Sequence, residues 1–194
     1  KVLEEARLEK ITSILEQGYM QGYAGNKFKP DNHITRAEAS VLFAGLIEED
    51  ASKKIVFPDV KKDVWYTDSV VKLASNGYLR AREDGNMHPN EDITRAEYAY
   101  ILAKLGKLPT SNQVIRDVPK EHWAAQAIAA CVEAGIISGY DDGTVRPDQS
   151  ITRAEAVSMI QRTFNTKKNI KNKTPYSDVK EGHWAYDVIV SARK

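Results

Sequence analysis

The 194-residue chain contains one cysteine, Cys131, and this scarcity restricts the chemistry that the protein can carry. A single thiol cannot form a disulfide within the chain, and it excludes a metal site built from several cysteines. Low cysteine content fits a cytosolic protein, and it also fits many bacterial surface proteins. The cysteine count therefore leaves the compartment open.

Long apolar runs and a surplus of charge are also missing. No hydrophobic run approaches the roughly 20 residues that span a bilayer, so we expect no membrane insertion. The chain has 28 lysines and arginines against 27 aspartates and glutamates. This balance gives no basic field for DNA or RNA, so we expect no nucleic-acid partner. No secretion signal stands at Lys1, although a processed chain would not retain one.

Catalytic and metal-binding motifs are absent from the sequence as well. It lacks the nucleophile elbow GxSxG, the zinc motif HExxH, the Walker loop and the dinucleotide loop GxGxxG. Segments 83–85 and 141–143 begin like calcium loops, but no glutamate stands at the twelfth position, so we predict turns. The four histidines are His33, His88, His122 and His183. We expect no metal at them, no cofactor, and no enzymatic activity in the chain.

What the sequence does contain is repetition. The five residues Ile-Thr-Arg-Ala-Glu occur at 34–38, 93–97 and 151–155. A threonine followed three residues later by glutamate, ahead of an apolar run, is a capping box. The threonine oxygen accepts from a backbone amide in the first helical turn, and the glutamate reaches back to the threonine amide. Each copy therefore predicts the start of a helix, the first of them covering 36–48.

The arginine of this motif occupies an unfavourable place. It stands at the first helical position in every copy, as Arg36, Arg95 and Arg153. The N-terminal end of a helix carries partial positive charge, so a cation there costs about 0.3–1 kcal/mol. An anion bound beside the guanidinium and the free helix amides would reverse that cost. A carboxylate of the protein itself would do the same, and the sequence leaves both explanations open.

The repeated unit is longer than this motif. Residues 16–39, 75–98 and 133–156 align without gaps. Each block starts with a glycine that ends a preceding helix, continues through a turn to a proline, and finishes in the capped helix. Apolar residues at three- and four-residue steps also predict a helix over 1–15, ahead of the first block.

A second signature links an Asp-Val pair to a tryptophan further along the chain. The pairs are Asp59 with Trp65, Asp117 with Trp123, and Asp178 with Trp184. We expect a helix after each tryptophan, with the tryptophan itself starting the inward stripe. Such an indole is either core or a platform for the apolar face of a sugar ring. The aspartate is either a loop-closing residue or an acceptor for sugar hydroxyls.

The head of the chain lacks this second signature, and Ala6 stands in the tryptophan column. We predict that the tail packs beside the first repeat and supplies what the head lacks. The repeats are then residues 1–52, 53–110 and 111–168, with 169–194 as a partial fourth repeat. A two-helix unit cannot bury both faces of its helices alone, so neighbouring units must do so. The units either stack as a solenoid or close into a pseudo-threefold bundle.

Taken together, these signatures resemble the surface-layer homology (SLH) family, whose modules anchor proteins to bacterial cell walls. The resemblance covers residues 16–194. It implies an all-α fold, a pseudo-threefold trimer of SLH repeats around a central three-helix bundle, with short loops and turns at the prongs and grooves between repeats. It also implies an extracellular location at the bacterial cell wall or S-layer, with lattice neighbours reached through fused domains.

The resemblance further implies a ligand and its site. SLH modules bind secondary cell wall polymers attached to peptidoglycan, and many of these carry a pyruvate ketal on N-acetylmannosamine. Carried over by position, Arg36, Arg95 and Arg153 would bind that carboxylate. The groove residues would be Asp59, Trp65, Asp117, Trp123, Asp178 and Trp184. Repeat 2 departs from this pattern, because Ala81-Arg82 stands where the others have Gly22-Tyr23 and Gly139-Tyr140. We therefore expect one or two competent grooves.

Two other functions compete with non-catalytic anchoring to a wall polymer. A helical-repeat scaffold would bind a protein, such as another copy in a surface lattice, through an exposed apolar groove. An enzyme acting on wall glycan would need two carboxylates about 5–9.5 Å apart in one groove. The scaffold would not depend on wall pyruvylation, whereas polymer binding would.

Overall fold

The computed structural model describes residues 2–48, 55–171 and 173–194, and every regular element in this part of the chain is a helix. The all-α prediction is confirmed. The helices are α1 (Val2–Glu16), α2 (Arg36–Ala44), α3 (Thr67–Ser75), α4 (Arg95–Leu105), α5 (Ala125–Glu133), α6 (Arg153–Phe164) and α7 (Tyr186–Ala192). None of these described helices is long and apolar enough to cross a membrane. The predicted boundary between residues 52 and 53 lies outside the described residues.

The three repeated motifs start α2, α4 and α6, as predicted. The N-cap residues are Thr35, Thr94 and Thr152. Each threonine hydroxyl accepts from the amide of the glutamate three residues on, and each glutamate accepts from the threonine amide. All three capping boxes therefore form. The first of these helices ends at Ala44, not at residue 48 as predicted, because glycine follows as the C-cap and disfavours further helix.

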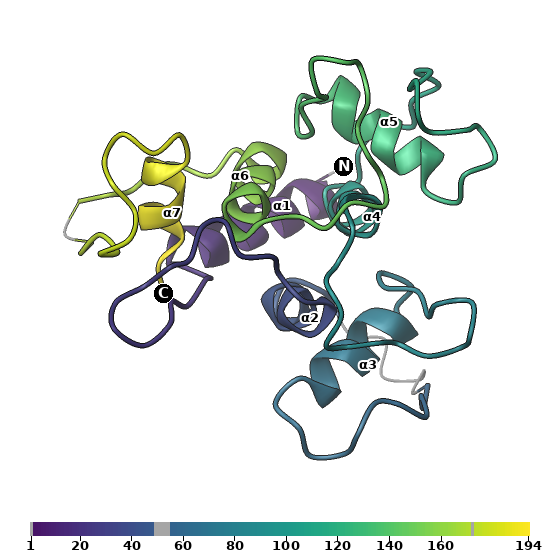
Figure 1. The fold of residues 1–194 in the computed structure, drawn as a ribbon, viewed down its shortest axis with the longest axis horizontal. Helices are drawn as coiled ribbons and strands as arrows, with labels where there is room; N and C mark the ends of the chain where they lie inside the picture. Colours follow the sequence, from purple (N-terminus) through teal and green to yellow (C-terminus); the bar gives the residue numbers. More distant parts are fainter. Residues whose placement is uncertain (1, 49–54, 172) are drawn as a thin grey trace.

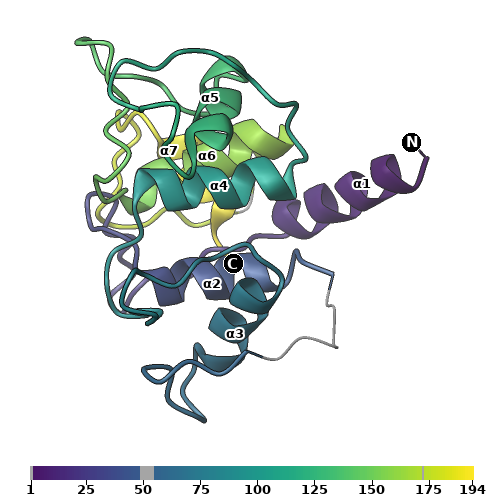
Figure 2. The ribbon, with the colours of Figure 1, turned by 90° about the vertical axis from the view of Figure 1, so that its right-hand side faces the viewer.

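Three helix pairs are arranged around a common centre (Figure 1). Within them α2 packs against α3, α4 against α5, and α6 against α7. Each capped helix thus pairs with the tryptophan-led helix that follows it, and the capped helices lie on the inside (Figure 1). α1 lies behind the centre, where it contacts α6 and α7, and its N-terminal half projects from the body (Figure 2).

A closed ring of backbone hydrogen bonds joins the three repeats. The amide of Ile34 donates to the Ile151 carbonyl, that of Ile151 to Ile93, and that of Ile93 to Ile34, at 3.3, 3.3 and 3.0 Å. Each link joins one copy of the five-residue motif to another, so the connection is threefold. A solenoid has two free ends and could not close such a ring. The bundle is therefore the arrangement that the chain adopts.

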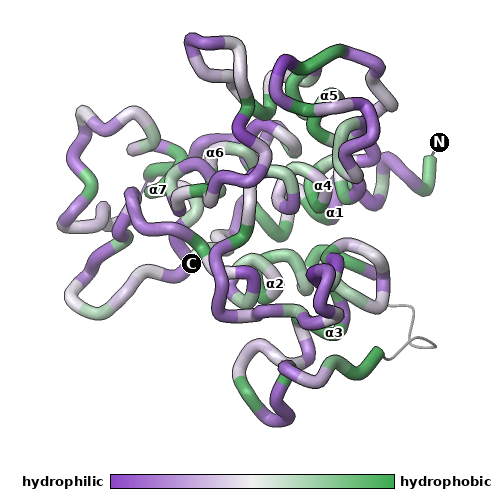
Figure 3. Tube along the Cα trace, turned by 45° about the vertical axis from the view of Figure 1, so that its right-hand side comes forward, coloured by the Kyte–Doolittle hydropathy of each residue, from purple (hydrophilic) through white to green (hydrophobic). Residues whose placement is uncertain are grey.

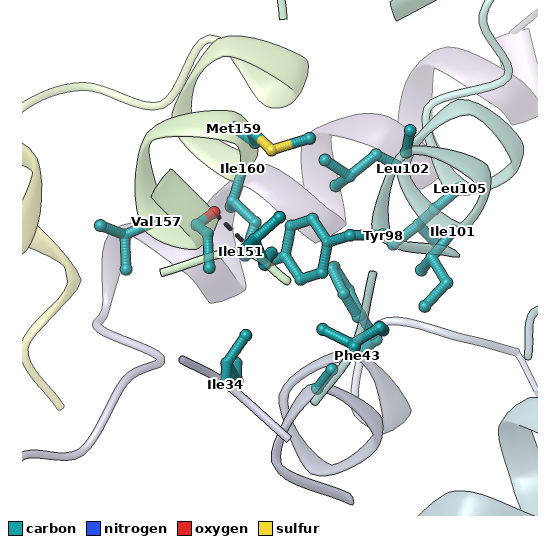
Figure 4. Close-up of a cluster of buried hydrophobic side chains, with 14 of the residues drawn as sticks. Ile34, Phe43, Tyr98, Ile101, Leu102, Leu105, Ile151, Val157, Met159 and Ile160 are labelled. Carbon is teal, nitrogen blue, oxygen red and sulfur yellow. Dashed lines mark hydrogen bonds between the residues drawn. The ribbon is translucent and has the colours of Figure 1, made fainter. Parts of the chain in front are cut away.

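The buried apolar side chains form one core cluster that includes residues of all three repeats. The outer loops contain many hydrophilic residues (Figure 3). Tyr98 of α4 lies in the middle of this core, fully buried, with its ring centroid 5.2 Å from that of Phe43 (Figure 4). Its hydroxyl donates to the Ala156 carbonyl at 3.2 Å. One side chain thus contacts all three repeats, and its hydroxyl avoids the cost of an unpaired buried polar group.

The tail completes the first repeat. The amides of Tyr19 and Met20 donate to the Ala192 carbonyl at the end of α7, at 2.9 and 2.8 Å. The equivalent bonds elsewhere run from Tyr78 and Leu79 to Leu73, and from Ile136 and Ile137 to Cys131. α7 therefore packs beside the first glycine block, as predicted for the tail. α1 does not fill that position, although Ala6 falls in the tryptophan column, and Ala6 is exposed.

Candidate functional site

The first glycine block, α2 and the loop before α3 enclose a hollow of about 440 Å³. We call it groove 1. Its polar and aromatic lining is Tyr19, Gln21, Gly22, Tyr23, Glu38, Trp65, Arg153 and Lys194, and Val41, Leu42 and Leu46 are part of an apolar wall. A volume of this order suits a small ligand or one unit of a polymer. The structure brings together here one predicted arginine and one predicted tryptophan from different repeats.

The tryptophans stand out from the surface instead of lying in the core. Trp65 is 65% exposed, Trp123 41% and Trp184 63%. Their prediction as the first inward residue of each helical stripe is wrong, because each helix begins only after the tryptophan and the stripe does not extend back to it. The residues that follow them are buried instead: Tyr66, Ala124 and Ala185. The exposed indoles are thus available as platforms for a ligand.

The motif arginines are buried, and each reaches into the glycine block of a neighbouring repeat. Their exposed fractions are 0% for Arg36, 5% for Arg95 and 4% for Arg153. The Nε atoms donate to the carbonyls of Met87, Val145 and Phe28, respectively. The Nη2 atoms donate to the carbonyls of Arg80, Ser138 and Gln21. Every motif arginine is therefore a clamp between repeats, whatever else it binds.

Two of these arginines also find a carboxylate within the protein. Arg36 pairs with Glu97, and Arg95 pairs with Glu155 at 2.9 Å. Burial lowers the pKa of the Arg36 guanidinium, and the negative charge of Glu97 opposes that shift. The glutamates are those of the capping boxes, one repeat further on. For these two cations, a carboxylate of the protein itself offsets the cost of a positive charge at a helix N-terminus.

Arg153 differs from its two counterparts. Among the residues that the structure describes, no carboxylate forms an ion pair with it. Glu38, at the equivalent position, accepts instead from the Tyr23 hydroxyl at 3.3 Å and from its own threonine amide at 2.9 Å. The Arg153 guanidinium carbon lies 4.7 Å from the Tyr23 ring centroid. A buried cation without a paired carboxylate is costly, so this edge of groove 1 favours an anionic ligand.

A larger hollow of about 1150 Å³ occupies the matching position one repeat on, and we call it groove 2. In groove 2, arginines of the chain itself lie against the tryptophan and the capping glutamate. The Arg80 guanidinium carbon lies 5.0 Å from the Trp123 ring centroid, and Arg82 Nη1 lies 3.4 Å from Glu97. The departure of repeat 2, Ala81-Arg82, therefore changes groove 2 by adding a cation where groove 1 has Tyr23.

The equivalent surface beside Trp184 is intermediate between the two grooves. Its tyrosine, Tyr140, is stacked by Arg146, whose guanidinium carbon lies 3.7 Å from the ring centroid. The Tyr140 hydroxyl donates to Gln149 at 3.5 Å and not to Glu155. The Glu155 carboxylate accepts from Arg95 instead. In the first repeat the residue aligned with Gln149 is Asn32, whose side chain is shorter. The Tyr23 hydroxyl there donates to Glu38 instead.

The three aspartates, Asp59, Asp117 and Asp178, close loops, which confirms the first of the two predicted roles. Both carboxylate oxygens of each accept from consecutive backbone amides of the next glycine block. Asp59 binds Met87 and His88, Asp117 binds Val145 and Arg146, and Asp178 binds Phe28 and Lys29. The second residue of each amide pair has a left-handed backbone, with φ of 44° to 57°. A role in binding sugar hydroxyls stays a prediction.

The sequence reasoning left Tyr23 and Glu38 out of the site. Tyr23 carried a signal, because its Gly-Tyr pair differs between repeats. Glu38 was recognised only as a cap. Gly22 is also required here, since a Cβ would lie 2.7 Å from the Lys27 carbonyl oxygen and would collide with the Tyr176 ring.

These features define a ring-closed module of three helical repeats, with an outward tryptophan ahead of each outer helix. The chain belongs to the S-layer homology domain family, whose model matches residues 10–40, 56–99 and 114–157. Family members have a cell-wall anchoring role, which places this module at the bacterial cell surface.

Relatives with described roles include three of different kinds. The chain is 37% identical to a cellulosome-anchoring protein of Acetivibrio thermocellus over 88% of its own length and 41% of that protein. It is 32% identical to the exoglucanase XynX of the same organism, over 82% of this chain and 15% of the enzyme. It is 28% identical to the S-layer protein sap of Bacillus anthracis, over 78% of this chain and 19% of that protein. The chain thus spans less than half the length of each.

Proposed function

We propose that the chain is a non-catalytic module that binds an anionic secondary cell wall polymer in groove 1. The polymer class that fits best is a glycan carrying a pyruvate ketal on N-acetylmannosamine. The observation that carries the proposal is Arg153, a buried cation that lines groove 1 without an ion-pair partner among the described residues. Its two counterparts are both neutralised by glutamates of the fold.

The chemistry of the proposed complex follows from the lining of groove 1. Two Arg153 nitrogens are held by the carbonyls of Phe28 and Gln21, so the guanidinium is fixed before any ligand arrives. The ligand carboxylate takes the remaining edge of the guanidinium. The exposed indole of Trp65 stacks on the apolar face of the sugar. A fixed binding group loses little conformational entropy on complex formation, which favours affinity.

The two competing functions find less support in groove 1. A glycan hydrolase needs a pair of carboxylates, whereas Glu38 is the one carboxylate in the described lining, and both its oxygens accept hydrogen bonds. A protein-binding scaffold would use the apolar wall formed by Val41, Leu42 and Leu46. That alternative needs no anion in the ligand, so the two functions differ in their dependence on Arg153.

The test is titration calorimetry with wall polymer purified in pyruvylated and non-pyruvylated forms. We expect Arg153→Gln to weaken binding of the pyruvylated polymer about 10- to 100-fold, because a hydrogen-bonded charge contributes about 1.5–3 kcal/mol. Trp65→Ala should weaken it about 5- to 10-fold through lost stacking. The pyruvate-free polymer should bind the unaltered protein as weakly as Arg153→Gln binds the intact polymer.

Matched variants separate binding from folding. Arg95→Gln removes the same kind of inter-repeat clamp at a site where the cation is already paired, so it should lower stability but leave affinity unchanged. Trp123→Ala, in groove 2, should leave affinity unchanged because Arg80 already covers that indole. If both groove 1 variants stay folded and bind as tightly as the unaltered protein, the proposed site is wrong. Equal binding of both polymer forms would favour the scaffold.

A further inference from the structure

A second hollow, of about 390 Å³, adjoins groove 1 and shares with it the segment Gln21-Gly22-Tyr23 and Lys194. We call it the tail hollow. The rest of its lining is Asn26 from the first glycine block and Tyr176 and Arg193 from the tail. Asn26, Tyr176 and Arg193 line the tail hollow but not groove 1. The hollow exists only because the tail docks beside the first repeat.

The charge of the tail hollow is positive. Its described lining includes two cationic side chains, Arg193 and Lys194, and no acidic side chain. The Arg193 guanidinium carbon lies 4.5 Å from the Tyr176 ring centroid. Its Nη1 donates to Asn26 Oδ1 at 2.7 Å and to the Thr174 carbonyl at 3.0 Å. Among the described side chains, no acid forms an ion pair with Arg193.

An arginine held in this way is suited to bind an anion. Neutral acceptors fix one nitrogen and the aromatic ring fixes the guanidinium plane, so the remaining donors are oriented without neutralisation of the charge. Carboxylate and phosphate groups match the planar donor set of a guanidinium. The polar shared segment, with a glycine at its middle, separates this cation from groove 1.

We propose that the tail hollow is a second subsite, which binds the anionic substituent of the polymer unit next to the one in groove 1. The substituent is a carboxylate or a phosphate. This inference rests on the proposed function, because it requires the polymer to occupy groove 1 first. Two units of one polymer bound side by side raise affinity, since the second contact is intramolecular. The tail then contributes to ligand binding as well as to packing beside the first repeat.

The experiment compares two probes by titration calorimetry: N-acetylmannosamine carrying a pyruvate ketal, and fragments of several units released from the polymer. We expect Arg193→Gln to leave binding of the monosaccharide unchanged and to weaken binding of the longer fragments about tenfold. Arg153→Gln should weaken both probes. Two modified fragments identify the anion that Arg193 recognises: one without phosphate, and one that keeps pyruvate on a single unit. The effect of Arg193→Gln disappears in the fragment that lacks the recognised anion.

Controls keep the subsite separate from tail docking. Hydrogen exchange of the Tyr19 and Met20 amides, which bond to the Ala192 carbonyl, reports docking directly and should be unchanged in Arg193→Gln. Lys180→Gln, at an exposed tail position, should have no effect on either probe. Equal binding of the longer fragments by Arg193→Gln and the unaltered protein would overturn the subsite but leave groove 1 intact. If Arg193→Gln lost affinity and also showed faster exchange of these two amides, the loss would be due to undocking of the tail. That result would overturn the subsite too. If the unaltered protein does not bind the monosaccharide, the proposed function fails first.

Discussion

Arg95, at the start of α4, donates across 2.9 Å to the carboxylate of Glu155, at the start of α6. The guanidinium of one five-residue motif is thus paired with the capping glutamate of another. The motif therefore acts twice, as a cap for its own helix and as a link between repeats. The link is present at two of the three joints among the described residues, and groove 1 lies at the third, where Arg153 remains unpaired.

The internal ion pairs predict different stabilities for two otherwise similar variants. Glu97→Gln keeps an oxygen for the capping box but leaves buried Arg36 without its ion-pair partner. We expect it to lower the free energy of unfolding by about 3–5 kcal/mol, as for other broken buried pairs. Glu38→Gln should cost less than about 1.5 kcal/mol, because it alters only a bond from the Tyr23 hydroxyl. Urea denaturation measures both, and equal losses would contradict the assignment.

Docking of the tail should depend on pH through Asp178. Partial burial tends to raise the pKa of this carboxyl, but the amides of Phe28 and Lys29 lower it, and the net shift is below its usual value of 3.8. A pKa depressed by folding gives stability that is present above the unfolded pKa and is lost as the pH falls through the folded value. We expect Asp178→Asn to be less stable than the unaltered protein at pH 7, by about 1.5–3 kcal/mol, and the difference to shrink below pH 4.

The measurement for Asp178 is urea denaturation between pH 7 and pH 2. Asp187→Asn is the matched control, because Asp187 lies on the same tail with its side chain 49% exposed and a lysine 3.7 Å away. That variant should follow the pH profile of the unaltered protein within about 0.5 kcal/mol. A constant difference between Asp178→Asn and the unaltered protein over the whole pH range would contradict the prediction.

Groove 2 should gain binding if its covering cations are replaced by the residues of groove 1. The triple variant Arg80→Gln, Ala81→Gly, Arg82→Tyr copies Gln21-Gly22-Tyr23. It uncovers Trp123 and places a tyrosine hydroxyl near Glu97, as Tyr23 lies near Glu38. We expect calorimetry with the pyruvylated polymer to detect an additional site per chain, about 10- to 100-fold weaker than groove 1 because Glu97 still pairs with Arg36.

The reverse exchange in groove 1 provides the control for that experiment. Tyr23→Arg should weaken binding there, because it places a second cation beside Glu38 and over the ligand site. Gly22 is left unchanged, since a side chain at that position would collide with Tyr176. If the triple variant folds and shows no new site, the Arg36–Glu97 pair, and not the covering arginines, keeps groove 2 closed.

Local features were predicted well because local energetics decides them. The three capping boxes form as expected, since a threonine and a glutamate three residues apart satisfy helix amides wherever the helix lies. The loop-closing role of the aspartates also agrees with the sequence. The tryptophans do not point inward as predicted, because each lies before its helix and helical periodicity does not apply to it. Trp65 precedes α3, and its neighbour Tyr66 is buried instead.

The sequence by itself determined the repeats, the helix starts and the family to which the chain belongs, because these depend on residue identity and spacing. Only the tertiary structure decided how the copies differ. Arg36, Arg95 and Arg153 are identical in sequence context, yet the first two are paired and the third is not. The difference arises from residues of other repeats, Tyr23 and Arg82 among them, which meet these arginines only when the ring closes. The tail also meets the first glycine block only in the folded chain, because its contacts there join segments about 150 residues apart.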